Sequence, residues 1–169
     1  MDLTTKRLTI HPLSLEEFSL YLQEDGSLEQ ALGLCPNTQK MEPHTKEAMG
    51  GLYQQALAAP ADILWHTNWQ VILPEQRQSI GSACFMGAPN AEGAVEMGYG
   101  MDAAFCGQGY MTEAVAAIAG WALAQPGVAK IIAETATDNK ASHRVLEKNG
   151  FEFCLEIGGH MFWSLAKEV

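Results

Sequence analysis

The chain has 169 residues, of which 47% are hydrophobic and 18% charged, and this composition predicts one globular domain spanning residues 1–169. Its 20 acidic residues outnumber the 10 basic ones, and the resulting net charge of -10 argues against nucleic-acid binding and favours cationic small molecules or basic protein segments. The four cysteines are widely spaced, no apolar stretch is long enough to span a bilayer, and nothing at the start resembles a signal peptide. We therefore expect a cytoplasmic protein with reduced thiols, no metal site and no membrane contact.

The first third of the chain predicts a strand and three helices, over residues 7–14, 15–23, 28–34 and 45–58. Leu8 and Ile10 alternate with polar residues, as in a strand with one buried face. Ser14 and Glu17 have the spacing of a capping box, which marks the start of the first helix. Pro60 stops the last of the three helices.

The rest of the chain predicts six strands, over 63–73, 79–87, 93–101, 129–137, 151–157 and 160–166, and two helices, over 112–125 and 140–149. Asn139 is the expected N-cap of the second of these helices. In the strand 93–101, Val95 and Met97 fall on one face, while Glu96 and Gly98 fall on the other. The order of elements predicts an α/β fold, with one mixed sheet and helices on both of its faces.

The segment "CGQGYMTEA", residues 106–114, places two glycines between a predicted strand and a predicted helix. The first N–H groups of a helix have no intrahelical partner, and the helix dipole adds a partial positive charge there. Glycines let the backbone approach an anion closely and adopt positive φ angles. The N–H groups from Gly107 to Thr112 are therefore predicted to hold a phosphate group in spite of the negative overall charge.

Three phosphate-binding motifs have glycine-rich loops of this kind. A Walker P-loop requires a lysine, which this loop lacks. The dinucleotide motif G-x-G-x-x-G is matched at Gly107 and Gly109 but has Thr112 in third place. Glu134 follows ~25 residues after the loop, near the place of a ribose-binding acid. The loop, however, comes after four predicted strands and leaves too little chain for a substrate domain, so nicotinamide binding is not expected. The third motif is the pyrophosphate loop of acyl-coenzyme A acetyltransferases.

Two segments together resemble the GNAT superfamily of N-acetyltransferases: "VEMGYGMDAAFCGQGYMTEAVAAI" and "ETATDNKASHRVLEKNGFEF". The nearest branch acetylates the N-terminal alanine or serine of ribosomal proteins, and "TTKRLTIHPLS" looks like the usual first strand of that branch. The resemblance covers nearly the whole chain. It implies a GNAT domain whose sheet has about seven strands, mostly antiparallel, with a central pair that splays apart. It also implies acetyl-CoA as the cosubstrate.

The resemblance implies direct attack of an amine on the thioester of acetyl-CoA within a ternary complex. Glu96 is the expected general base, acting directly or through water, and Ser142 is the expected general acid for the departing thiolate. A backbone N–H near Met97 or Gly98 is expected to polarise the thioester carbonyl. Asn139 is expected both to cap its helix and to contact the cofactor. The full predicted cofactor-binding set is Met97, Gly98, Cys106, Gly107, Gln108, Gly109, Tyr110, Met111, Thr112, Asn139 and Ser142.

Several residues near these motifs also have a purely structural interpretation. Glu96 has the alternative of a solvated strand residue, and Glu113 is expected to interact with the helix dipole. Cys106 stands where the family usually has Gln or Arg, which predicts a weaker cofactor contact. A nucleophilic role for Cys106 is not expected, because direct transfer needs no covalent intermediate. The last helix is expected to carry His143 on its surface, together with a solvated basic stripe formed by Lys140, Arg144 and Lys148.

The acceptor amine is not specified by any motif. An α-amine with a pKa near 8 is about one-tenth neutral at pH 7, against about one in 2,500 for a lysine amine, so an N-terminal acceptor requires little from the base. The candidates are a protein N-terminus, such as that of a ribosomal protein, and a small cationic amine. Four residues are candidates to border the acceptor pocket, namely Trp65, His66, Asn68 and Trp69. A non-catalytic acyl-CoA sensor with the same fold is the alternative function, and a homodimer is a further expectation, since dimers are common among relatives.

Overall fold

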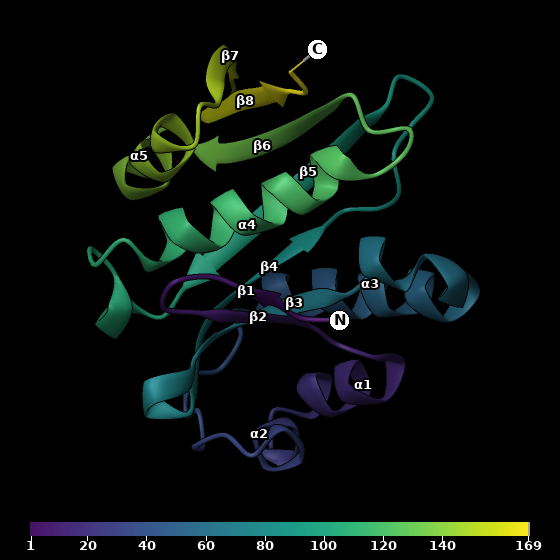
Figure 1. Ribbon diagram of the computed structural model, residues 1–169, viewed down its shortest axis with the longest axis vertical. Helices are drawn as coiled ribbons and strands as arrows, with labels where there is room; N and C mark the ends of the chain where they lie inside the picture. Colours follow the sequence, from purple (N-terminus) through teal and green to yellow (C-terminus); the bar gives the residue numbers. More distant parts are fainter. Residues whose placement is uncertain (169) are drawn as a thin grey trace.

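The computed structural model describes residues 1–168, which form one open sheet of eight strands in the order β1-β2-β3-β4-β5-β6-β8-β7 (Figure 1). Neighbouring strands are antiparallel except for the parallel pair β5 and β6. The strands are β1 Leu3–Thr4, β2 Thr9–Pro12, β3 Asn68–Leu73, β4 Gln78–Phe85, β5 Ala94–Met101, β6 Lys130–Ala136, β7 Glu152–Ile157 and β8 His160–Ala166. The predicted mixed, mostly antiparallel sheet is confirmed. The strand that the sequence did not reveal is β1, whose two residues are too few to show a periodic pattern.

Helices cover both faces of the sheet, as predicted. Those within residues 1–168 are α1 Leu15–Gln23, α2 Ser27–Leu32, α3 Pro43–Ala58, α4 Tyr110–Ala124 and α5 Lys140–Lys148. In Figure 1, α4 crosses in front of the central strands, whereas α3 lies behind the sheet. The capping box of α1 is present, because Ser14 and Glu17 each accept a hydrogen bond from the other's backbone N–H. None of the helices in this range is long and apolar enough to cross a bilayer.

Alternate residues of β3 and β4 point into two separate cores. Trp69 and Phe85 pack under α4, with ring centroids 4.9 and 5.8 Å from that of Trp121. Cys84, which neighbours Phe85 in β4, packs instead with Met49 in the core beneath α1 and α3. Fully burying one large apolar side chain stabilises a fold by about 1.5–3 kcal/mol, so both faces of these strands contribute to stability.

The predicted strand over 63–73 is wrong in its first half. Residues Pro60–Trp65 form a 3-10 helix, and β3 begins only at Asn68. The ring of Trp65 packs 4.9 Å from the rings of both Phe85 and Trp121, measured between centroids. Trp65 is therefore apolar because it packs in an aromatic cluster under α4, and not because this segment forms a strand.

The parallel pair at the centre of the sheet opens along its length. Its register comprises three residue pairs, Ala94 with Lys130, Val95 with Ile131 and Glu96 with Ile132. Beyond them β5 continues to Met101 along β4, and β6 continues to Ala136 along β8. The splayed central pair is therefore present and begins at Met97. We refer to the space between the diverging strands as the β5–β6 opening.

Candidate functional site

The glycine loop connects β5 to the start of α4. Gly107 and Gly109 have φ angles of +76° and +80°, in the left-handed region that strains any residue with a Cβ atom. Gly109 is the N-cap of α4, and its carbonyl accepts from the N–H of Glu113 at 3.1 Å. The N–H groups from Gly107 to Thr112 precede this first hydrogen bond of α4, so they are available to an anion.

Arg7 is a cation beside this loop, and no pattern in the sequence marked it as part of the site. Its Nη1 donates to the carbonyl of Gln108 at 3.0 Å, and its guanidinium carbon lies 4.3 Å from the centre of the Tyr110 ring. Its Nε and its backbone N–H donate to the two carboxylate oxygens of Glu113, both at 2.8 Å. With a side chain 38% exposed, Arg7 braces the loop and also adds positive charge where an anion would bind.

Glu113 has the structural role that was expected, with more partners than the helix dipole. It accepts from the hydroxyl of Thr5 at 2.5 Å as well as from Arg7. Burial raises the pKa of Glu113, but the hydrogen bonds from Thr5 and Arg7 outweigh burial and lower it. The carboxylate thus ties the turn between β1 and β2 to the first turn of α4.

The start of α5 lies at the β5–β6 opening. Asn139 caps the helix, because its Oδ1 accepts from the N–H of Ser142 at 3.2 Å. The hydroxyl of Tyr99, on the diverging part of β5, donates to the carbonyl of Ser142 at 3.2 Å. Burial raises the pKa of Tyr99 to about 12, so this hydroxyl stays a donor at neutral pH. Within residues 1–168 the hydroxyl of Ser142 makes no hydrogen bond, which leaves it available to a ligand.

Two further residues position α5. His143 is buried, with only 6% of its surface exposed, and the prediction that it lies on the helix surface is wrong. Its Nε2 is 3.0 Å from the carbonyl of Ala136, and its ring lies 5.4 Å from that of Trp163. Asn149, at the other end, donates to the carbonyl of Thr112 at 3.2 Å and so links α5 to the start of α4. The basic stripe of Lys140, Arg144 and Lys148 is exposed.

Glu96 lies on the sheet face opposite to Ser142, in a hollow of about 230 Å³. Met86 and Ile132 line the same hollow. Burial raises the pKa of the Glu96 carboxyl, and the negative charge of Glu134 raises it further. A carboxylate with a raised pKa is a stronger base at neutral pH, so the position suits proton abstraction.

The backbone of β5 shows which N–H groups face the opening. The carbonyl of Glu96 accepts from the N–H of Met86, the residue after β4, at 2.9 Å, and Gly98 is paired opposite Cys84 of β4. Because backbone groups alternate in direction along a strand, the N–H of Met97 and that of Tyr99 face β6 instead. Gly98 lines a cavity through its bare Cα rather than presenting its N–H to the opening.

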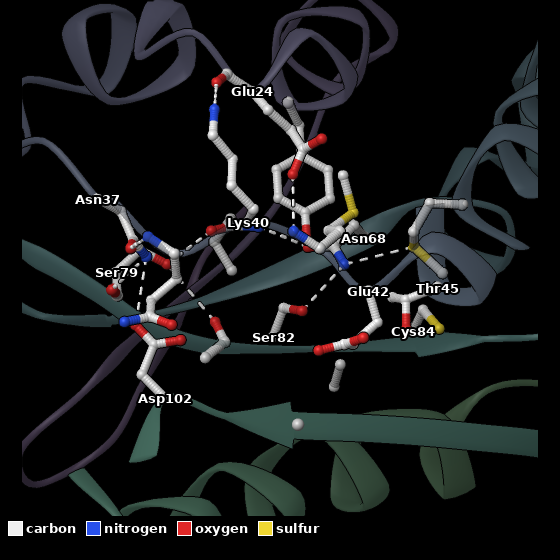
Figure 2. A pocket seen from close by; sticks show the side chains of 18 of the residues that line it. Glu24, Asn37, Lys40, Glu42, Thr45, Asn68, Ser79, Ser82, Cys84 and Asp102 are labelled. Carbon is white, nitrogen blue, oxygen red and sulfur yellow. Dashed lines mark hydrogen bonds between the residues drawn. The ribbon is translucent and has the colours of Figure 1, made fainter. Parts of the chain in front are cut away.

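A larger cavity of about 550 Å³ lies on the Glu96 side of the sheet (Figure 2). Its floor comes from β3, β4 and β5, and its walls come from α1, α3 and the loop between α2 and α3. Asn68 lines it. Trp65 and Trp69 belong to the core under α4 on the opposite face, and His66 is absent from the lining, so three of the four predicted border residues do not face this cavity.

The cysteines and histidines give no sign of a reactive or metal centre. Within residues 1–168, no group of three or more His, Cys, Asp or Glu residues is placed to hold a metal ion. Cys106 is exposed, and its Sγ lies 3.6 Å from the carbonyl of Asp102, at the end of β5. Cys84 is buried, which raises the pKa of its thiol to about 11 and keeps it protonated.

Comparison with known proteins agrees with this arrangement. The acetyltransferase (GNAT) domain family matches residues 7–152. The chain is 25% identical over 149 residues to an uncharacterised N-acetyltransferase, YjdG, of Bacillus subtilis (strain 168), and the match covers 88% of each chain. The fold is similar to that of the ribosomal-protein-S5-alanine acetyltransferase from Vibrio fischeri, with a TM-score of 0.71 and 18% identity over 99% of this chain and 97% of that one. It is also similar to RimL, a ribosomal L7/L12 alpha-N-protein acetyltransferase solved with coenzyme A, with a TM-score of 0.67 and 15% identity over 98% of both chains.

The matched range contains β5, β6, the glycine loop and α5, and these parts lie around the β5–β6 opening. An anion site on the loop, a hydroxyl on one sheet face and a carboxylate on the other suit group transfer from a phosphate-anchored donor. The resemblance expected from the sequence is thus confirmed, and the chain belongs to the acetyltransferase (GNAT) family.

Proposed function

We propose that this GNAT acetyltransferase transfers the acetyl group of acetyl-CoA directly to a primary amine, with both substrates bound together. The observation that supports the proposal most is the β5–β6 opening, which has Glu96 on one face and Ser142 on the other. Acetyl-CoA, when bound, supplies the activated acetyl thioester. The glycine loop suits its pyrophosphate, because a Cβ atom on Gly107 would meet nothing within 4 Å and the N–H groups beside it are free.

Glu96 is the proposed general base for the acceptor amine. Its carboxylate lines the hollow of about 230 Å³, and its raised pKa brings its basicity closer to neutral pH. Taking one proton from the ammonium group, directly or through water, leaves the amine lone pair free to attack. An α-amine with a pKa near 8 needs only modest assistance of this kind.

Groups on the other side of the opening are placed to stabilise the charges that develop on the thioester carbonyl and on the departing thiolate. The N–H of Met97 or of Tyr99 faces the opening and is placed to polarise a thioester carbonyl there. The free hydroxyl of Ser142 donates a proton to the departing thiolate, while Asn139 and Tyr99 hold the first turn of α5 in place. Base and acid thus act from opposite faces of the sheet.

A primary amine as the acceptor agrees with the net charge of -10, which attracts cations. Solved structures of similar fold include acetyltransferases of ribosomal-protein alanine and of ribosomal L7/L12 N-termini. A protein N-terminus and a small-molecule amine both fit the proposed chemistry.

Calorimetric titration with acetyl-CoA tests the first half of the proposal, with NAD and ATP as control ligands. We expect micromolar binding, about -8 kcal/mol, for acetyl-CoA alone. Amine-dependent release of the coenzyme A thiol then tests the second half. Absence of acetyl-CoA binding contradicts the whole proposal, whereas binding without thiol release for any amine indicates a non-catalytic sensor.

Replacing Ser142 with alanine removes only the hydroxyl and should lower kcat by roughly 10- to 100-fold, because the thiolate then leaves without a proton donor. The Kd for acetyl-CoA should change little, since the backbone contacts of residue 142 remain. Ser164→Ala, the same change on β8, serves as the matched control. If kcat of Ser142→Ala equals that of the wild type, water protonates the thiolate and the assignment is wrong.

Replacing Arg7 with alanine should weaken acetyl-CoA binding by roughly 5- to 10-fold, because the glycine loop loses its brace and a nearby positive charge. The melting temperature should fall as well, since Glu113 keeps a partly buried carboxylate without its charged partner. Lys6→Ala, which removes an adjacent exposed charge, should do neither. An unchanged Kd in Arg7→Ala would leave Arg7 with a purely structural role.

A further inference from the structure

We propose that the larger cavity is the acceptor site and that it takes a small hydroxylated amine rather than a polypeptide N-terminus. This inference rests on the proposed acetyl transfer, whose acceptor it specifies. Four features of the cavity support the inference. They are its polar floor, the carboxylates at its rim, the loop that forms one of its walls, and the side chain that separates it from Glu96.

The floor of the cavity is polar at positions where the sheet would ordinarily bury apolar groups. Asn68 and Gln70 of β3 are 2% and 4% exposed, and Ser79 of β4 is 5% exposed. Gln70 donates to Oδ1 of Asn68 at 2.6 Å and accepts from the hydroxyl of Ser79 at 2.6 Å. Asn68 in turn donates to the hydroxyl of Ser82 at 3.1 Å. These contacts form a continuous row of amide and hydroxyl groups, labelled in part in Figure 2.

On their other face the same strands bury the apolar side chains of Trp69, Val71 and Phe85 completely. Burying polar side chains is unfavourable compared with burying apolar ones, so a structural role alone does not account for a polar row on one face only. An amide with two donors and two acceptor lone pairs keeps bonding capacity after one contact of each kind. A hydroxyl group both donates and accepts, and it therefore matches this row better than a purely cationic or apolar group.

Carboxylates stand at the rim of the cavity, where an ammonium group would be attracted. Glu42, at the start of α3, and Asp102, at the end of β5, both line it (Figure 2). Burial raises the pKa of Asp102, against the effect of a hydrogen bond from Asn37 at 3.2 Å. Glu24 also lines the cavity but is paired with Lys46 at 2.7 Å. Glu42 and Glu29, which both line the cavity, are thus the carboxylates most available to a cation, since no hydrogen bond or ion pair within residues 1–168 involves either side chain.

The loop between α2 and α3 forms one wall of the cavity and is held at two points. Asn37 bonds Asp102 at one end of the floor. At the other end Met41 donates its N–H to the carboxylate of Glu24 at 2.7 Å, and Lys40 bonds the carbonyl of Glu24. The cavity stays partly open to solvent, and its volume of about 550 Å³ is in the usual range for a site that takes a small molecule.

Met86 separates this cavity from the hollow that contains Glu96, because its side chain lines both. Its methyl group would lie 3.0 Å from a Cβ atom on Gly98, so Gly98 must stay bare for Met86 to rest there. Met86 is 46% exposed and has a flexible side chain. When it moves aside, an amine held in the cavity reaches across Gly98 to Glu96 and the β5–β6 opening.

The inference is tested with three acceptors at matched concentrations: glucosamine, spermidine, and a basic peptide with a free N-terminal alanine. Thiol release is measured for the wild type, for Gln70→Leu and for Gln54→Leu. Gln54 lies in α3, is exposed and is not part of the cavity lining, so it provides the same substitution outside the proposed site. Glu42→Gln is a surface variant that changes charge alone and guards against a folding defect in Gln70→Leu. The melting temperature and the Kd for acetyl-CoA are recorded for every variant.

We expect glucosamine to be the preferred acceptor of the three. Gln70→Leu should raise its KM by roughly 10-fold or more, with the acetyl-CoA Kd unchanged, and Gln54→Leu should leave the KM near the wild-type value. Glu42→Gln should raise the KM severalfold. Preference for the peptide or for spermidine overturns the inference, as does an unchanged KM in both Gln70→Leu and Glu42→Gln. If acetyl-CoA itself does not bind, the proposed function fails, and glucosamine binding measured without the coenzyme then decides the cavity assignment separately.

Discussion

Glu96→Gln is expected to lower kcat by about 100-fold at neutral pH and to leave the Kd for acetyl-CoA within about twofold of the wild-type value. The substitution keeps the shape of the side chain and removes only its basicity. Steady-state kinetics with a saturating amine, together with calorimetry, measure the two quantities. Glu92→Gln, the same change in the turn before β5, is the control and should retain full activity. A Glu96→Gln enzyme with normal kcat would make Glu96 a solvated strand residue.

The pH profile gives an independent check on the same carboxylate. Burial and the negative charge of Glu134 raise the pKa of Glu96, so its active, deprotonated form is lost as the pH falls through a value above the ordinary one near 4.3. Glu134→Gln removes the like charge and lowers the pKa of Glu96. The acidic limb of the kcat profile should therefore move to lower pH in this variant. A limb that stays in place would show that another group controls it.

Gly109→Ala is expected to weaken acetyl-CoA binding by about 10-fold or more. An alanine at a φ of +80° costs about 1–2 kcal/mol in the left-handed region, and the loop relieves this strain only by turning its N–H groups away from their present direction. The new Cβ atom would also lie 3.4 Å from Nη2 of Arg7, which braces the loop. Calorimetry measures the Kd, and thermal unfolding should show a melting temperature lower by about 2–6 °C.

Gly120→Ala is the matched control for this prediction. Gly120 lies inside α4, and a Cβ atom there meets nothing within 4 Å. Alanine in a helix interior is favoured over glycine by roughly 0.5–1 kcal/mol, so this variant should be more stable and bind acetyl-CoA normally. Equal Kd values for Gly109→Ala and the wild type would show that the loop does not depend on the left-handed conformation of residue 109.

The parts of the site that the sequence predicted are those defined by local chain geometry. Gly107 and Gly109 occur in a short loop whose φ angles only glycine adopts easily, and Asn139 caps the helix that follows it directly. The alternation that places Glu96 opposite Met97 is likewise a property of one strand. Such features need no information about distant segments, and they are the ones that the structure reproduces.

The parts that were missed or wrong depend on contacts between distant segments. Arg7 meets its partners 101 to 106 residues away, and no pattern in the residues around it marks it as a neighbour of the glycine loop. Trp65 was assigned to a strand because it is apolar, but its ring packs in the aromatic cluster under α4. His143 is polar yet buried, since the carbonyl of Ala136 and the ring of Trp163 provide a place for it. The larger cavity combines residues from at least six elements, which a linear pattern cannot bring together.

The contact between Arg7 and Glu113 has a consequence for how the enzyme assembles. Every motif residue of the predicted cofactor site lies between residues 97 and 142, so a fragment containing only the second half of the chain would carry the whole set. It would nevertheless lack the turn formed by Thr5 and Arg7, which holds the first turn of α4 and the carbonyl of Gln108. The N-terminal turn must therefore meet the segment around residues 108–113 before the loop is complete. During synthesis on the ribosome, the turn at Thr5 and Arg7 is made first, but its partner helix α4 emerges more than a hundred residues later. The complete cofactor site would therefore form late in folding.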